Sequence, residues 1–259
     1  MLRFFRQIRQ RLLTDNKFSK YLLYAIGEIL LVVIGILIAL QVDNWNQDRL
    51  ERQEEFKYLE RIRVDLVQDT LYYNKRIQDA KSGIERNIKA IRLAHKKQEN
   101  LDDVFELLLL HDFQGEHLTI QNDTYLEMTS SGNINLLKND DLKISIIALY
   151  RDAKAATTHV KEYNEFTASI MSDFATVLPK SRYYRWYEDV FNDPEMFDMN
   201  DVKFINDPSS YEFQLTESVL YDFLVKHRVL LPYYFDLKAK SSNIIKTIDE
   251  ELGRRQMIF

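Results

Sequence analysis

Residues 142–177 read LKISIIALYRDAKAATTHVKEYNEFTASIMSDFATV, and this stretch decides the fold class. Apolar and small residues recur in it at alternating steps of four and three, namely at Leu142, Ile146, Leu149, Ala153, Ala156, Val160, Tyr163, Thr167, Ile170, Phe174 and Val177. A period of 3.5 residues is typical of helices that pack as in coiled coils. The stretch therefore predicts a long helix with one buried face, with Asn139 as its N-cap and Pro179 after its end.

The remainder of the chain is also predicted to be helical. Its 259 residues include only 6 Gly and 4 Pro, too few for the turns of sandwiches, barrels or doubly wound α/β folds. We expect helices at about 46–98, 101–110, 118–131, 211–230 and 233–252, with Gly132 and Pro232 closing two of them. A break near Gly83 is left open, because glycine costs about 1 kcal/mol in a helix interior. Residues 192–210 are expected to be irregular. The predicted fold is an all-α, elongated antiparallel helical bundle.

An apolar segment precedes this bundle. Residues 21–42 read YLLYAIGEILLVVIGILIALQV, in which only Glu28 and Gln41 are strongly polar. A helix of this length spans about 33 Å, enough for a bilayer core of about 30 Å. A cleaved signal peptide is the rival interpretation, but its apolar run would be shorter and would end at small residues. We therefore predict an uncleaved transmembrane helix at 21–42.

The charges on either side of the segment predict its orientation. Residues 1–20 carry six basic side chains against Asp15, a net charge of +5, whereas residues 43–57 carry three basic and five acidic side chains. The positive-inside rule places the basic flank in the cytoplasm. The flank either lies along the inner leaflet as an amphipathic helix or only sets the topology. Residues 43–259 are then an exported domain, and their acidic balance argues against a nucleic-acid partner.

Five stretches resemble an uncharacterised family of single-pass membrane proteins common in Bacteroidota. They read FFRQIR at 4–9, NKFSKYLLYAIGE at 16–28, ALQVDNWN at 39–46, TYLE at 124–127 and SSGNINLL at 130–137. The resemblance implies residence in the inner membrane, with the exported domain in the periplasm. It supplies no catalytic residues, because the family is one of unknown function.

Glu28 is the most informative residue of the apolar segment. An ionisable side chain within a membrane costs free energy and typically faces a partner. Gly35 and Ala39 form a pair of small residues four apart, and Glu28 shares their face of the helix. This face predicts a helix–helix contact, in a homo-oligomer or with another membrane protein. The alternative is that Glu28 extends to the bilayer surface or pairs with a basic neighbour such as Lys20.

An aromatic cluster follows the heptad stretch. It consists of Tyr183, Tyr184, Arg185, Trp186 and Tyr187. Aromatic side chains and arginine are enriched where proteins bind partners, so the cluster is a candidate surface for a partner or glycan. Packing of both faces of a helix explains it almost as well.

No catalytic motif is present. The nearest approach to a metal site is His111, Asp112, Glu116 and His117, whose spacing matches no known ligand pattern. We expect no cofactor, no metal and no enzymatic activity. The leading hypothesis is a membrane-anchored helical scaffold or interaction protein of the cell envelope. The alternative is an exported, ligand-sensing bundle that signals through its anchor to a partner.

Overall fold

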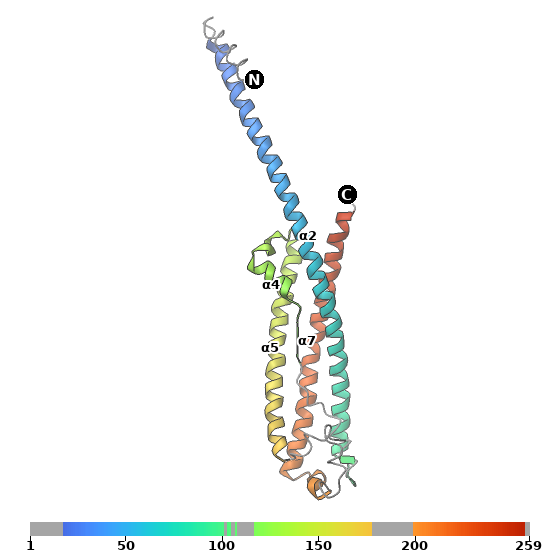
Figure 1. The fold of residues 1–259 in the computed structure, drawn as a ribbon. Coiled ribbons are helices and arrows are strands. Elements are labelled where there is room, and N and C mark those ends of the chain that lie inside the picture. The colour runs from blue at the N-terminus through green and yellow to red at the C-terminus, as the bar shows by residue number, and fades with distance from the viewer. Residues whose placement is uncertain (1–17, 101–102, 105–106, 108–116, 178–198, 257–259) are drawn as a thin grey trace. The chain divides into compact units, whose positions relative to one another are not determined.

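The computed structural model describes residues 18–100, 103–104, 107, 117–177 and 199–256, and this part of the chain contains helices and no strands (Figure 1). The α-helices are α2 (Phe18–Ala94), α4 (Asp123–Ser130), α5 (Asp140–Val177) and α7 (Tyr211–Gln256). Two 3₁₀ helices are present, η1 (Asn133–Leu136) and η3 (Met199–Asn206). The all-α prediction is confirmed for these residues. Most of the helix expected at 101–110, and Pro179, lie outside them.

The chain divides into two compact units, residues 1–57 and 58–259. The described part of the first unit is the beginning of α2, whose large apolar side chains at Leu22 and from Ile26 to Val42 are exposed. By length and composition, this helix is able to cross a membrane, and none of its most apolar window is buried. In water such a surface would be unfavourable, at about 25 cal/mol for each Å² of exposed apolar area.

In the second unit, α5 buries the face that its heptads predict. Eight of the ten stripe residues whose burial is described are buried, among them Ile146 and Ala153, which are fully enclosed. Tyr163 and Ile170 lie half-buried at the edge of the stripe. Asn139 accepts a hydrogen bond from the Leu142 amide at 3.0 Å, which confirms the predicted N-cap.

Helix α7 contacts both α5 and the part of α2 that belongs to the second unit, residues 58–94. The contacts with α5 are Lys226 with Asn164, Tyr233 with His159, and Lys240 with Asp152. Those with α2 are His227 with Gly83, Lys238 with Asn74, and Asp249 with Arg63. In both sets the partner residue number falls as the number along α7 rises. The helices of each pair therefore run in opposite directions where they touch.

Helix α2 continues through Gly83 without a break. A Cβ atom built at Gly83 would lie within 3.0 Å of three ring atoms of His227, which is itself only 5 % exposed. The glycine thus provides the space for the imidazole ring. Beyond this point the buried face of α2 consists of Asn87, Ala90 and Ala94. The isoleucines at the predicted apolar spacing, Ile84, Ile88 and Ile91, are only half-buried.

The predicted boundary at Pro232 is wrong, because α7 is a single helix with Pro232 in its interior. Proline lacks an N–H group and deprives the carbonyl four residues earlier of its donor. Here Pro232 and Arg228 both lie on the exposed side of α7, where water is available to that carbonyl. On the opposite side, Leu230 and Tyr234 are fully buried, and their packing favours a continuous helix.

Two further boundaries differ from the sequence-based expectation. The helix expected at 118–131 begins only at Asp123, and residues 117–122 have no regular structure. Residues 199–206, within the stretch expected to be irregular, form η3, which buries Val202 and Ile205. These two residues join a core cluster with Ala94, Phe174 and Phe213.

We predict that Gly83→Ala destabilises the protein by about 1–3 kcal/mol, because the added methyl group would overlap the ring of His227. Urea unfolding of the full chain in detergent, followed by far-UV circular dichroism, measures this change.

Gly253→Ala is the matched control. Gly253 also lies within a helix, but nothing surrounds the position of its missing Cβ within 4 Å. Its replacement is expected to be neutral or to stabilise the protein by up to about 1 kcal/mol. Equal effects of the two variants would show that the contact with His227 is unimportant.

Candidate functional site

The short segment from α4 to η1 makes several polar contacts with α2. Helix α4 buries Thr124 and Met128 and ends at Ser130, and Gly132, two residues later, has a left-handed φ of 78°. At this end of the helix, Ser131 Oγ and Ser130 Oγ both donate hydrogen bonds to the Glu127 carbonyl, at 2.8 and 3.1 Å. The predicted stop at Gly132 is therefore confirmed.

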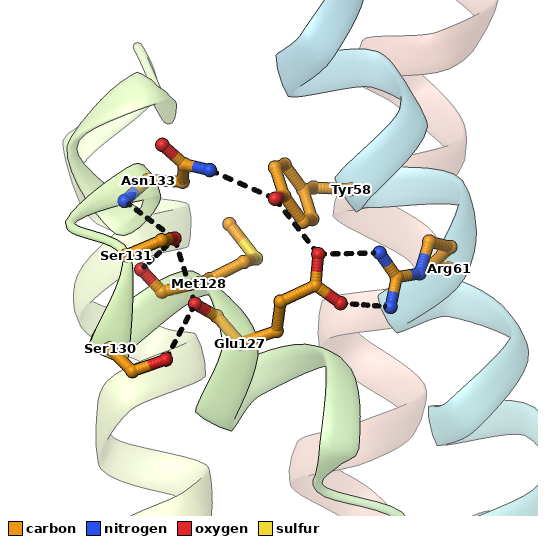
Figure 2. Close-up of polar contacts among 7 residues, drawn as sticks. All are labelled: Tyr58, Arg61, Glu127, Met128, Ser130, Ser131 and Asn133. Carbon is orange, nitrogen blue, oxygen red and sulfur yellow. Dashed lines mark hydrogen bonds and ion pairs between the residues drawn. The ribbon is translucent and has the colours of Figure 1, made fainter.

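Glu127 connects α4 to α2. Figure 2 shows its carboxylate facing Arg61, which donates from both terminal nitrogens at 3.1 and 2.5 Å. Tyr58 donates its hydroxyl to Glu127 Oε1 at 3.0 Å and accepts from Asn133 Nδ2 at 2.9 Å. The hydrogen bond from Arg61, followed by that from Tyr58, holds the pKa of Glu127 below its ordinary value. We call Tyr58, Arg61, Glu127 and Asn133 the Glu127 network.

The segment 117–122, just before α4, is fastened by side chains from two helices. On α2, Tyr72 donates to the carbonyl of His117 and accepts from the amide of Thr119. Asp69 accepts from the amide of Gln121 at 3.0 Å. On α5, Tyr150 donates to the carbonyl of Gln121 at 3.2 Å. These bonds occupy backbone groups that a helix would use, which explains why α4 begins later than predicted.

Asp69 is the buried acid of this arrangement, at 2 % exposure. Burial raises the pKa of Asp69 to about 6, with a further contribution from the charge of Asp65, one turn away; the Gln121 amide opposes the shift. Burial also raises the pKa of Tyr150 and of Tyr73. The ring of Tyr125 stacks on that of Tyr150 at 4.2 Å. A buried carboxyl group with a raised pKa is the kind of group that is enriched at functional sites.

The residues predicted from sequence lie elsewhere. Glu28, Gly35 and Ala39 are exposed along one face of α2, and nothing approaches the missing Cβ of Gly35 within 4 Å. The aromatic cluster, Tyr183, Tyr184, Arg185, Trp186 and Tyr187, lies outside the described residues, as do His111, Asp112 and Glu116. His117 is described and exposed. In the described ranges, no group of three or more His, Asp or Glu side chains is placed to hold a metal ion.

Comparison with known proteins places the chain in a family. Residues 28–208 match the model of DUF6090, a family of unknown function. The chain belongs to DUF6090. No curated protein and no solved structure matches it. The DUF6090 match contains the whole Glu127 network, Asp65, Asp69 and Tyr150, whereas α7 begins after its end.

The sequence analysis did not identify the Glu127 network or Asp69 as candidate sites, although the sequence contains signals for both. Glu127 and Asn133 fall in the stretches TYLE and SSGNINLL that carry the family resemblance. Asp69 lies three residues after Leu66 and four before Tyr73, so it occupies the apolar stripe of its helix. A carboxylate on a buried stripe is rare and indicates a hydrogen-bonded or titrating group.

We predict that Tyr58→Phe lowers the free energy of unfolding by about 1 kcal/mol, because the buried hydroxyl joins Glu127 to Asn133. Tyr211→Phe is the control, since Tyr211 is 66 % exposed, and we expect it to be neutral. Urea unfolding measures both. A Tyr58→Phe protein as stable as the control would contradict a stabilising role of the Glu127 network.

Proposed function

We propose that the protein is a single-pass membrane protein in which residues 21–42 span the inner membrane and residues 43–259 form a periplasmic domain. The observation that carries this proposal is the exposed apolar surface of α2 from Ile26 to Val42. The basic flank before it and the acidic residues after it favour a cytoplasmic N-terminus.

We further propose that the exported domain is an antiparallel helical bundle with coiled-coil-like packing. The opposite order of contacts along α7 and its two neighbours supports this architecture. The buried heptad stripe of α5 supports it as well. Such a bundle on a single anchor fits a scaffold or interaction protein of the cell envelope, without catalytic activity.

The proposed contact with a partner lies in the membrane. Glu28, Gly35 and Ala39 are separated by seven and four residues and so share one face of a helix. Small side chains at Gly35 and Ala39 would allow a second helix to approach closely, and Glu28 would gain a polar partner there. A second copy of the chain is the simplest partner, and another membrane protein is the alternative.

The chain has no cysteine, so single cysteines report topology without a background signal. In intact spheroplasts, we expect a membrane-impermeant maleimide to label Ser242→Cys, which is exposed in α7. Thr14→Cys should be labelled only after lysis. The cysteine-free parent is the control, and the reverse labelling pattern would contradict the proposed orientation.

A second pair of cysteines tests the membrane contact. With an oxidant, we expect Ala39→Cys to form a disulfide-linked dimer and Leu37→Cys, about 200° away around the helix, to remain monomeric. If neither variant dimerises, the alternative partner, another membrane protein, is tested by in-cell crosslinking with mass spectrometry. The experiment compares the wild type with Glu28→Leu. A protein that stays monomeric and crosslinks to no other protein would contradict the scaffold function. A small molecule that stabilises the exported domain would instead favour the ligand-sensing alternative.

A further inference from the structure

The carboxylates of Asp65 and Asp69 lie one turn apart on α2 and have few donors between them. Asp69 Oδ1 receives the amide of Gln121 at 3.0 Å. Asp65 Oδ2 is buried and has no hydrogen-bond partner among the described residues. Burial and the neighbouring charge of Asp65 both act against ionisation of Asp69.

Two hydroxyl groups close to this pair already donate elsewhere. Tyr150 on α5 donates its only hydroxyl proton to the carbonyl of Gln121, and Tyr72 on α2 donates to that of His117. A phenol has a single proton to donate, so neither is available to a carboxylate. Tyr73 on α2 and Tyr125 on α4 are further ionisable groups around the site.

The neighbouring cations donate mainly to other groups. Arg61 lies one turn before Asp65 and interacts with its charge, but its terminal nitrogens donate to Glu127. From α7, Lys238 donates to Asn74. Asp249, the acid of α7 that contacts this part of α2, is paired with Arg63. The Asp65–Asp69 pair therefore lacks a hydrogen-bonded cation among these neighbours.

We propose that Asp69, beside the carboxylate of Asp65, holds one exchangeable proton, and that this proton controls how tightly the segment 117–122 is attached to α2. With the proton bound, repulsion between the two carboxylates is relieved and the Gln121 amide stays on Asp69. Without it, two charges are confined near a single donor, and opening of the segment lets water solvate them. This proposal goes beyond the membrane-anchored scaffold, because it makes the attachment of α4 sensitive to the pH around the domain.

The direction of the effect follows from proton linkage. The pKa of Asp69 is raised to about 6 when the segment is attached, and an open, solvated aspartate has a pKa of about 3.9. The attached form therefore binds the proton more tightly, so acidification from pH 7.5 to 5 favours attachment. For these values the opening equilibrium falls about tenfold.

Hydrogen exchange of the full-length protein in detergent micelles tests the proposal, with mass spectrometry of peptides covering 117–125. After correction for the intrinsic exchange rate at each pH, we expect the Gln121 amide to be about tenfold more protected at pH 5 than at pH 7.5. Asp69→Asn keeps an acceptor for that amide but does not titrate, so this tenfold ratio should disappear. Asp65→Asn, the second variant, should reduce the ratio because it removes the neighbouring charge.

Two control variants separate titration from attachment. Glu60→Gln removes an exposed carboxylate of the same helix and should keep the wild-type ratio. Tyr150→Phe removes the bond to the carbonyl of Gln121 and leaves both acids in place. It should increase exchange at both pH values and leave the ratio unchanged. A wild-type ratio near one, or an unchanged ratio in Asp69→Asn, would overturn the proposal.

Discussion

The close approach of α2 and α7 at Gly83 is the constraint on which the helical unit of residues 58–259 depends. The ring of His227 occupies the space that a side chain at residue 83 would fill. Farther along α2, the buried positions hold Ala90 and Ala94, which are small enough for the same approach. Large side chains at these positions would separate the helices and open the core around Phe174 and Phe213. A glycine that weakens an isolated helix is here required by its neighbour.

The sequence predicted the long helices well where one periodic face carries the packing. The stripe of α5 and its cap at Asn139 are examples, because both depend on local spacing and local hydrogen bonds. The same reasoning failed at Pro232, where burial of Leu230 and Tyr234 on the other side of the helix outweighs the missing hydrogen bond. It also failed at residues 118–122, whose backbone partners come from α2 and α5, distant in the chain. Local pattern contains no information on such partners.

The candidate sites were less predictable than the fold. Glu127 and Arg61 are 66 residues apart in the chain, and nothing in the spacing of either helix joins them. Asp69 was detectable in principle, as a charged residue on an apolar stripe, but its titration depends on the enclosure that the 117–122 segment provides. Two of the five stretches that carry the family resemblance, 124–127 and 130–137, contain Glu127, Gly132 and Asn133. These three residues therefore have a structural explanation within DUF6090.

Two of the connections that join helix α4 and the preceding segment to α2 differ in how strongly dissolved ions screen them. The pair of Arg61 and Glu127 is about half-exposed on both sides, so dissolved ions reach it and screen its attraction. The bond between Asp69 and the Gln121 amide is enclosed, and mobile ions screen it much less. A change in the salt content of the surrounding fluid therefore acts on the first connection, while a change in its acidity acts on the second. The attachment of the same short helix thus responds separately to the ionic strength and to the pH of its medium.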